Sequence, residues 1–231
     1  MENFVDILKD IMKEFKEELL DEGSIFVSEA DFQFCLARKL AQKIGSDKII
    51  LEYPENNKYV DLLCKFNDYT YYLELKYKTN ELKFLRYKQK INLKIQSAQN
   101  DNRYLLYKDI ERLEGFIKDK DKAVGISLFV TNDKNYWKNT TPPSAKNFPL
   151  CNAKTNSKNY LCVKCPRKDN PIFCSDKNKL CYLDKNSDDK KRALVINNVY
   201  NCQWNDFGFI KINDNTKKNL EFRYLLIEVT K

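Results

Sequence analysis

The spacing of hydrophobic residues predicts two helices at the start of the chain. In residues 2–21, apolar residues recur every three or four positions with charges between them, as in an amphipathic helix; they are Phe4, Ile7, Leu8, Ile11, Phe15 and Leu19. Ser28-Glu-Ala-Asp31 has the form of a capping box and opens a second helix, about 29–43, that ends near Gly45. We expect Phe32, Leu36 and Leu40 on its buried face.

Strand patterns follow the second helix. Residues 48–53 predict a strand that ends where Pro54-Glu-Asn-Asn57 breaks the pattern. Residues 59–66 and 69–77 predict two further strands joined by a tight turn at Asn67-Asp68. This hairpin is the stretch around which we expect the rest of the chain to be organised.

The hairpin sets the positions of three charged residues. In a symmetric two-residue turn, facing positions sum to 135, so Asp61 lies opposite Glu74, whereas an odd loop length would move Asp61 to the other face. Strand alternation places Lys76 on the same face as Glu74, and the apolar Leu73, Leu75 and Tyr77 on the other face. Facing carboxylates repel each other, and a divalent cation between them would relieve that repulsion.

The remaining core elements are less regular. Residues 79–95 are basic and rich in aromatic residues, and we expect them to be helical. A helical stripe follows, formed by Leu105, Leu106, Ile110, Leu113 and Ile117, and the apolar run 122–131 predicts a strand buried on both faces. Tyr136 and Trp137 are expected in the core. The segments 193–200, 202–210 and 220–229 predict strands near the C-terminus.

These elements predict an α/β fold with a mixed central sheet flanked by helices, over residues 1–138 and 193–231. Residues 139–192 hold five of the six prolines with little periodicity, which predicts a loop-rich, Cys-rich insertion. A structural zinc ion could staple it through Cys162, Cys165, Cys174 and Cys181. An iron–sulfur cluster and unligated thiols are the alternatives.

Composition limits the chemistry. The net charge of +8 favours a polyanionic partner. The chain has no histidine, which excludes Ser-His-Asp triads and imidazole metal sites. Carboxylates suit Mg²⁺ or Mn²⁺. Since no apolar run reaches membrane-span length and no signal peptide is evident, we expect a cytoplasmic protein without a membrane partner.

Asp61, twelve intervening residues and Glu74-Leu-Lys76 resemble the Asp…(Asp/Glu)-x-Lys core of the PD-(D/E)xK, or restriction-endonuclease-like, nuclease superfamily, although Val60 stands where the family name has proline. The resemblance implies a restriction-endonuclease-like core and a Mg²⁺-dependent nuclease, with restriction or phage defence as one setting. It assigns Asp61, Glu74 and the Leu75 carbonyl to the metal and Lys76 to catalysis. Glu29 would be a further metal ligand or, alternatively, only complements the helix dipole.

The nucleic-acid partner, DNA in preference to RNA, would contact a basic stretch and the next helix. The candidate residues are Lys78, Lys83, Arg86, Lys88, Lys90, Gln99 and Arg103. A solvated charged face is the alternative for the basic stretch, and Asp109, Glu111 and Arg112 are expected to be internal ion pairs. A non-catalytic nucleic-acid-binding protein is the alternative function, and a structural or interaction protein a third possibility. The resemblance also makes a homodimer an expectation.

Overall fold

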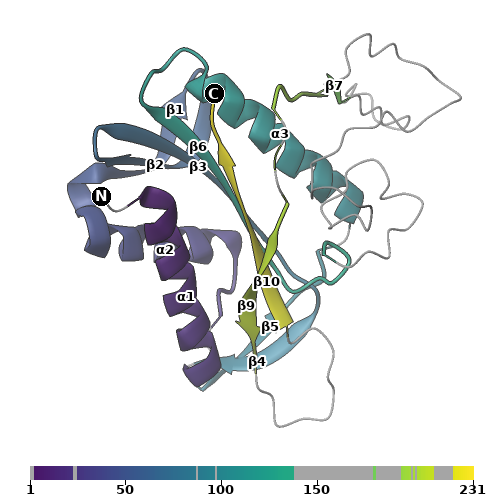
Figure 1. Cartoon of the computed structure of the whole chain (residues 1–231). Coiled ribbons are helices and arrows are strands. Elements are labelled where there is room, and N and C mark those ends of the chain that lie inside the picture. Colours follow the sequence, from purple (N-terminus) through teal and green to yellow (C-terminus); the bar gives the residue numbers. More distant parts are fainter. Residues whose placement is uncertain are drawn as a thin grey trace, which may run out of the picture.

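The computed structural model describes residues 3–22, 25–86, 88–96, 98–137, 179–180, 194–198, 200, 202–210 and 221–231. Its centre is a six-stranded sheet in the order β1-β2-β3-β6-β10-β9 (Figure 1). The strands are β1 (Ile49–Glu55), β2 (Lys58–Phe66), β3 (Tyr69–Lys78), β6 (Ala123–Thr131), β9 (Trp204–Phe209) and β10 (Glu221–Val229). The four cysteines of the expected zinc site lie outside the described residues.

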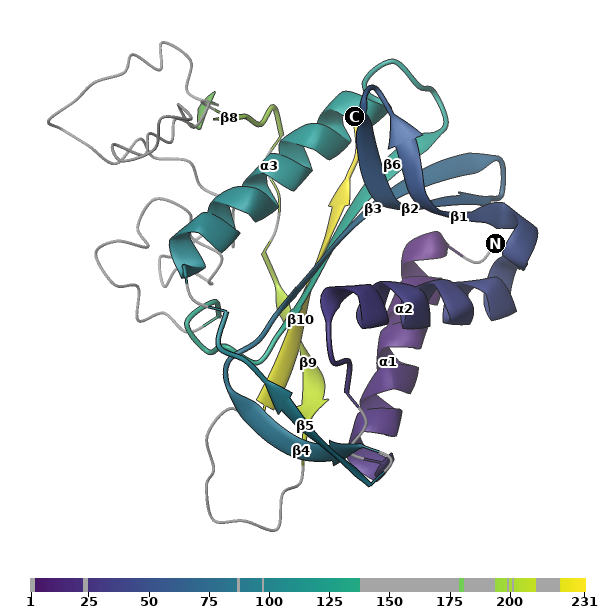
Figure 2. The same cartoon turned by 180° about the vertical axis from the view of Figure 1, so that it is seen from behind.

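The sheet is mixed, as predicted. β1, β2 and β3 are antiparallel neighbours, β3 and β6 are parallel, and β10 pairs antiparallel with both β6 and β9. Helix α3 (Gln99–Ile117) makes the crossover between the two parallel strands. Figures 1 and 2 show α3 on one face of the sheet, and α1 (Phe4–Glu22) and α2 (Glu29–Ile44) on the other.

The predicted hairpin register is confirmed over the paired residues, which end one position before Asp61 and Glu74. The pairs run from Leu62 opposite Leu73 to Phe66 opposite Tyr69, so facing positions sum to 135. Asn67 and Asp68 both have left-handed backbone angles, with φ of 48° and 65°. Two such residues in succession form a type I′ turn, whose twist matches that of the flanking strands. The turn therefore fixes which residues of β2 face which residues of β3.

The predicted ends of α2 are also confirmed. The Ser28 hydroxyl accepts a hydrogen bond from the Asp31 amide at 3.0 Å, and Asp31 Oδ2 accepts one from the Val27 amide at 2.9 Å. This satisfies two backbone donors around the first turn, as a capping box does. Gly45 ends the helix with φ of +100°, a conformation that favours glycine. The cap holds Glu29 at the start of the helix.

Two expectations about strands were wrong. Pro54 does not break β1, which runs to Glu55 and turns at Asn56-Asn57. Because β1 is an edge strand, the missing amide of proline costs no ladder bond on the solvent side. Residues 79–95 are not helical: β4 (Leu82–Arg86) and β5 (Gln89–Leu93) form an antiparallel hairpin.

Most of the predicted core is observed. Every residue of β6 is buried, and Tyr136 and Trp137 are buried beside it. The stripe on α3 is buried except for Leu105, which is exposed. A three-residue turn of 3₁₀ helix, η1 (Ser46–Lys48), and the two-residue strands β7 (Lys179–Leu180) and β8 (Leu194–Val195) complete the elements of the described residues. None of the described helices is long and apolar enough to cross a membrane.

Candidate active site

The three motif residues lie on the two strands of the hairpin. Asp61 is one position beyond the last paired residues of β2 and β3, Leu62 and Leu73. Its Oδ2 accepts a hydrogen bond from the Leu75 amide at 2.6 Å, so the carboxylate takes a place that a backbone carbonyl would hold in a continued ladder. On the other side, Gln33 of α2 donates to the Asp61 carbonyl at 2.7 Å. The aspartate is thus fixed from both sides.

Helix α3 contacts Glu74 and Lys76 through two charged residues. Lys76 Nζ lies 3.0 Å from Asp109 Oδ2. Arg112 lies 3.4 Å from Asp109 Oδ1 and also pairs with Glu74 Oε2. Lysine, aspartate, arginine and glutamate therefore alternate in one chain of contacts between β3 and α3. We call these four residues the charged quartet.

The quartet confirms one sequence-based expectation and extends it. Asp109 and Arg112 form internal ion pairs, as expected, but their partners include Lys76 and Glu74 of the hairpin. The sequence contained a signal for this: both residues interrupt the apolar stripe of a helix that packs on the sheet, at positions next to the buried Ile110 and Leu113. Gln33, which holds the Asp61 backbone, had no such signal.

Burial shifts the titration of the carboxyl groups. Desolvation is the largest effect on Asp61 and raises its pKa to about 6, although the Leu75 amide and the Lys76 charge oppose it. Desolvation, followed by the negative charges of Asp109 and Asp61, also raises the pKa of Glu74. Buried carboxyl groups with displaced pKa values are typical of functional sites, although structural ion pairs also produce them.

Lys76 remains a cation in this environment. Desolvation alone would lower its pKa, but the charges of Asp109 and Glu29 raise it above the ordinary lysine value. Its ammonium group also donates to the Leu75 carbonyl at 3.3 Å. The Lys76 side chain is 16% exposed, so it is largely but not completely shielded from solvent.

Glu29 lies at the same end of β3. Its Oε2 accepts a hydrogen bond from the Tyr77 amide at 2.8 Å and lies 3.4 Å from Lys78 Nζ. The side chain is 40% exposed. Glu29 therefore joins the first turn of α2 to the edge of the motif, and it is far more accessible than Glu74, which is only 1% exposed.

The residues fit a Mg²⁺ or Mn²⁺ ion in their donor chemistry. Glu74 Oε1 is buried and accepts no hydrogen bond from any described residue. A buried carboxylate oxygen without a donor is costly unless a cation compensates it. Among the described residues, no group of three or more Asp, Glu or Cys side chains converges on one point. Mg²⁺ needs no such cage, because it binds through one or two carboxylates together with waters and phosphate oxygens.

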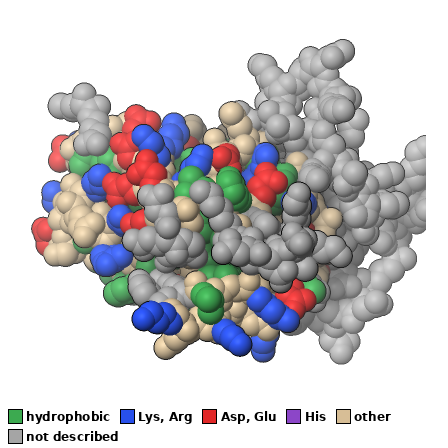
Figure 3. Space-filling model, turned by 90° about the horizontal axis from the view of Figure 1, so that it is seen from below, with side chains coloured by type: hydrophobic (Ala, Val, Ile, Leu, Met, Phe, Trp, Pro, Cys, Tyr) green, Lys and Arg blue, Asp and Glu red, His purple; other side chains and the backbone are tan. Residues whose placement is uncertain are grey.

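The expected nucleic-acid-binding residues have different surroundings. Lys83, Lys88 and Lys90 of the β4–β5 hairpin are exposed, with Lys83 3.5 Å from Glu81. Lys78 pairs with Glu29, and the side chain of Arg86 is not among the described ones. Figure 3, which views the molecule from below, shows basic and acidic side chains mixed on the described surface. Of the expected nucleic-acid-binding residues, Lys83, Lys88 and Lys90 are therefore the ones that the structure shows exposed to solvent.

Gln99 and Arg103 make contacts within the protein. Gln99 donates to Asp133 Oδ2 at 3.0 Å, and Arg103 donates to the Asn135 carbonyl and lies over the Tyr136 ring. Arg103 is 3% exposed. Both side chains therefore tie the start of α3 to the segment after β6.

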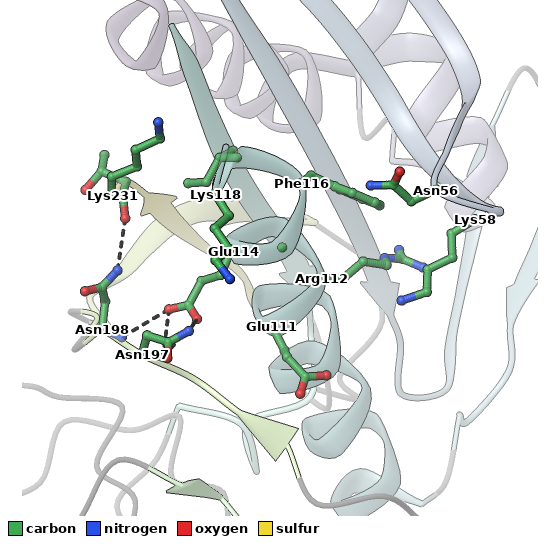
Figure 4. Close-up of a pocket in the computed structure, with 13 residues that line it drawn as sticks. Asn56, Lys58, Glu111, Arg112, Glu114, Phe116, Lys118, Asn197, Asn198 and Lys231 are labelled. Carbon is green, nitrogen blue, oxygen red and sulfur yellow. Dashed lines mark hydrogen bonds between the residues drawn. The ribbon is translucent and has the colours of Figure 1, made fainter. Parts of the chain in front are cut away.

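A pocket of about 610 Å³ lies along the C-terminal half of α3 (Figure 4). It shares Arg112 with the charged quartet but contains none of the three motif residues. Figure 4 shows Glu114 turned toward Asn197 and Asn198, whose amides donate to its carboxylate. These bonds attach the segment after β8 to α3. Because the pocket contains none of the motif residues, it lies beside the candidate site and is not the site itself.

Comparison with known proteins assigns no role to the residues of this site. No protein-family model matches the chain, no curated protein matches its sequence, and no solved structure matches its fold.

Proposed function

We propose that the protein is a Mg²⁺-dependent nuclease that hydrolyses phosphodiester bonds, with DNA as the preferred substrate and Mn²⁺ as an alternative ion. The supporting observation is the association of Asp61, Glu74 and Lys76 on adjacent strands, with two desolvated carboxyl groups and one cation. The mixed sheet flanked by helices is compatible with the restriction-endonuclease-like core that the motif implies. A DNA backbone also suits the net charge of +8.

Each residue has a role in this proposal. Asp61 and Glu74 hold the metal, with the Leu75 carbonyl as a further ligand and Glu29 as a ligand or as a holder of a bound water. When bound, the ion polarises the scissile phosphate and lowers the pKa of an attacking water. The Lys76 ammonium orients that water and offsets the negative charge that develops on the phosphate in the transition state. Asp109 keeps this lysine charged.

The test is cleavage of supercoiled plasmid DNA, single-stranded DNA and a structured RNA with Mg²⁺ or Mn²⁺. Asp61→Ala and Lys76→Ala should each lower the rate by at least about 100-fold, since each removes a group that acts on the charge developing in the transition state. The matched controls are Asp119→Ala and Lys65→Ala, which change exposed residues of the same types. DNA binding in the absence of metal should survive in all four variants.

A non-catalytic nucleic-acid-binding function is the competing outcome. The exposed Lys83, Lys88 and Lys90 favour it, because they can contact phosphates without any chemistry at the hairpin. Binding that weakens when these lysines are changed, together with no cleavage by the wild-type protein under any of the conditions, would replace the nuclease proposal. A homodimer and a zinc-stapled insertion stay predictions, which light scattering and metal analysis of the purified protein test.

A further inference from the structure

Asp109 is the residue on which the charged quartet depends. It contacts Lys76 through Oδ2 at 3.0 Å and Arg112 through Oδ1 at 3.4 Å, so each of its oxygens faces a different cation. Its side chain is only 8% exposed. Its neighbours on the same face of α3, Leu106 and Leu113, belong to the apolar core.

Packing alone does not explain an aspartate at this position. A helix that covers a sheet is most stable with an apolar residue here, and burying an ion pair rarely stabilises a fold more than apolar side chains of similar size. Asp109 does pair with two cations, Lys76 and Arg112. Both cations belong to the motif or to its partners, since Lys76 is a motif residue and Arg112 pairs with Glu74. The network therefore serves the motif residues more than the core.

We propose that Asp109 is the positioning residue for Lys76, fixing its ammonium group beside the carboxylates of Asp61 and Glu74, while Arg112 connects Asp109 to Glu74. This inference rests on the proposed nuclease function for its purpose, but the pairing itself can be tested without any activity. In this proposal Asp109 acts only through its contact with Lys76.

The physical reason is the flexibility of lysine. Its ammonium ends a stem of four methylene groups, and an unrestrained side chain spreads over many rotamers. The Asp109 carboxylate selects rotamers that bring Nζ within hydrogen-bonding distance of the Leu75 carbonyl, which is the backbone position between Glu74 and Lys76. Without this partner, the same lysine could reach the solvent, because its side chain is already 16% exposed.

The first measurement is the ammonium signal of Lys76 in a ¹H–¹⁵N spectrum of uniformly labelled protein. A lysine ammonium that is held by a buried carboxylate exchanges its protons slowly enough to be seen, and Lys76→Arg identifies the signal by removing it. In Asp109→Asn the signal should disappear, because the ammonium protons then exchange rapidly with water. Asp119→Asn, the same change at an exposed position, should leave the signal in place. An unchanged signal in Asp109→Asn would overturn the inference, even if the protein proves not to be a nuclease.

The second measurement is plasmid cleavage in a double-mutant cycle. Asp109→Asn should slow cleavage by about 10- to 100-fold, the usual effect of removing a residue that orients a catalytic group, with DNA affinity unchanged. In the Lys76→Ala background the same change should alter the residual rate by less than about 2-fold, because its target is gone. Equal losses in both backgrounds would mean that Asp109 acts through general stability, and the inference would fail while the nuclease function stood.

A folding control completes the design. Should Asp109→Asn not fold, Asp109→Glu takes its place, since it keeps the charge and moves the carboxylate outward by one methylene group. This variant should shift the Lys76 ammonium signal to a new position if the two residues are paired. A signal at the wild-type position would count against the pairing.

Discussion

The two faces of the central sheet solve the same packing problem with different residues. On the face covered by α1 and α2, the strands present Leu62, Leu73 and Leu75 to a continuous apolar cluster. On the face covered by α3, the apolar cluster is interrupted where Glu74 and Lys76 meet Asp109 and Arg112. One strand, β3, contributes to both faces, so the difference does not come from its place in the sheet.

This difference separates stability from function. Apolar burial stabilises the fold in proportion to the area removed from water, and the α1–α2 face uses it throughout. The α3 face replaces part of that burial with ions whose desolvation opposes their attraction. Stability given up in a confined group of residues is what a functional site is expected to show. Substitutions on the two faces should therefore behave differently.

The largest effect is expected on the apolar face. Leu40 of α2 is fully buried, and Leu40→Ala should lower the free energy of unfolding by about 4 kcal/mol, because it removes apolar contacts and leaves a cavity. The loss should be nearly the same at pH 5 and pH 8, since no ionisable group is involved. Urea unfolding at the two pH values measures it. A cost that changes strongly with pH would show that the two faces are energetically coupled.

On the α3 face, the cost of a substitution should depend on pH. Arg112→Met keeps most of the side-chain volume but removes the cation that opposes the raised pKa of Glu74, which desolvation and the charges of Asp109 and Asp61 place at about 9. Because wild-type Glu74 already holds its proton below about pH 9, the variant should lose little stability through this group at pH 6, and the added cost should grow as the pH rises through about 9. Urea unfolding across this range tests the expectation.

The matching control removes the stranded charge as well. In the double variant Arg112→Met with Glu74→Met, most of the stability lost above about pH 9 should return, because replacing a buried ion pair by apolar residues is often neutral or stabilising. A double variant that is no more stable than the single one would mean that Glu74 is ionised and compensated by some other group.

The sequence predicted the fold best where local chemistry and hydrophobic pattern agree. The capping box at Ser28 fixes the start of α2, and the two-residue turn at Asn67-Asp68 fixes the register of β2 and β3. The β4–β5 hairpin was missed because its turn at Lys88 has no glycine or asparagine to mark it. Apolar residues do occupy every second position in this segment, at Leu82 and Phe84 and again at Ile91 and Leu93. The many lysines between and around them make this strand pattern hard to recognise.

The site could be predicted on the hairpin but not across the sheet. Asp61, Glu74 and Lys76 are connected by a short turn whose register can be counted from the sequence. Asp109 and Arg112 reach them only because α3 crosses between β3 and β6, and no spacing along the chain encodes that contact. Charged residues within an apolar helical stripe are the one local sign of such a contact, and from the sequence they predict internal ion pairs without naming the partners.

A substitution on β2 should increase stability. The pKa of Asp61 rises from 3.8 to about 6 on folding, so the folded protein binds this proton more tightly than the unfolded chain does. The wild-type protein therefore loses stability as the pH rises from about 4 to about 6, by up to about 3 kcal/mol. Because asparagine cannot ionise, Asp61→Asn should be more stable by up to this amount at pH 7 and equal to wild type at pH 3.

This gain should be measured by chemical unfolding of protein freed of metal with EDTA. Asp119→Asn, at an exposed position, should change the unfolding free energy little at either pH. Under the nuclease proposal, the more stable Asp61→Asn variant is also the inactive one, the usual relation at a strained site. A variant that is less stable at pH 7 would show that the bond from the Leu75 amide outweighs the desolvation of the charge.

The smallest effect is expected where the apolar face meets the candidate site. Ser28→Ala removes the hydroxyl that accepts the Asp31 amide and should cost about 1 kcal/mol. Under the nuclease proposal, cleavage at 25 °C should be unchanged, because Glu29 is still held by the Tyr77 amide and Lys78. Ser46→Ala, which removes an exposed hydroxyl at the first residue of η1, is the matched control. If Ser28→Ala slowed cleavage as much as Glu29→Ala, measured in parallel, the cap would be needed to position Glu29. The candidate site would then extend into the first turn of α2.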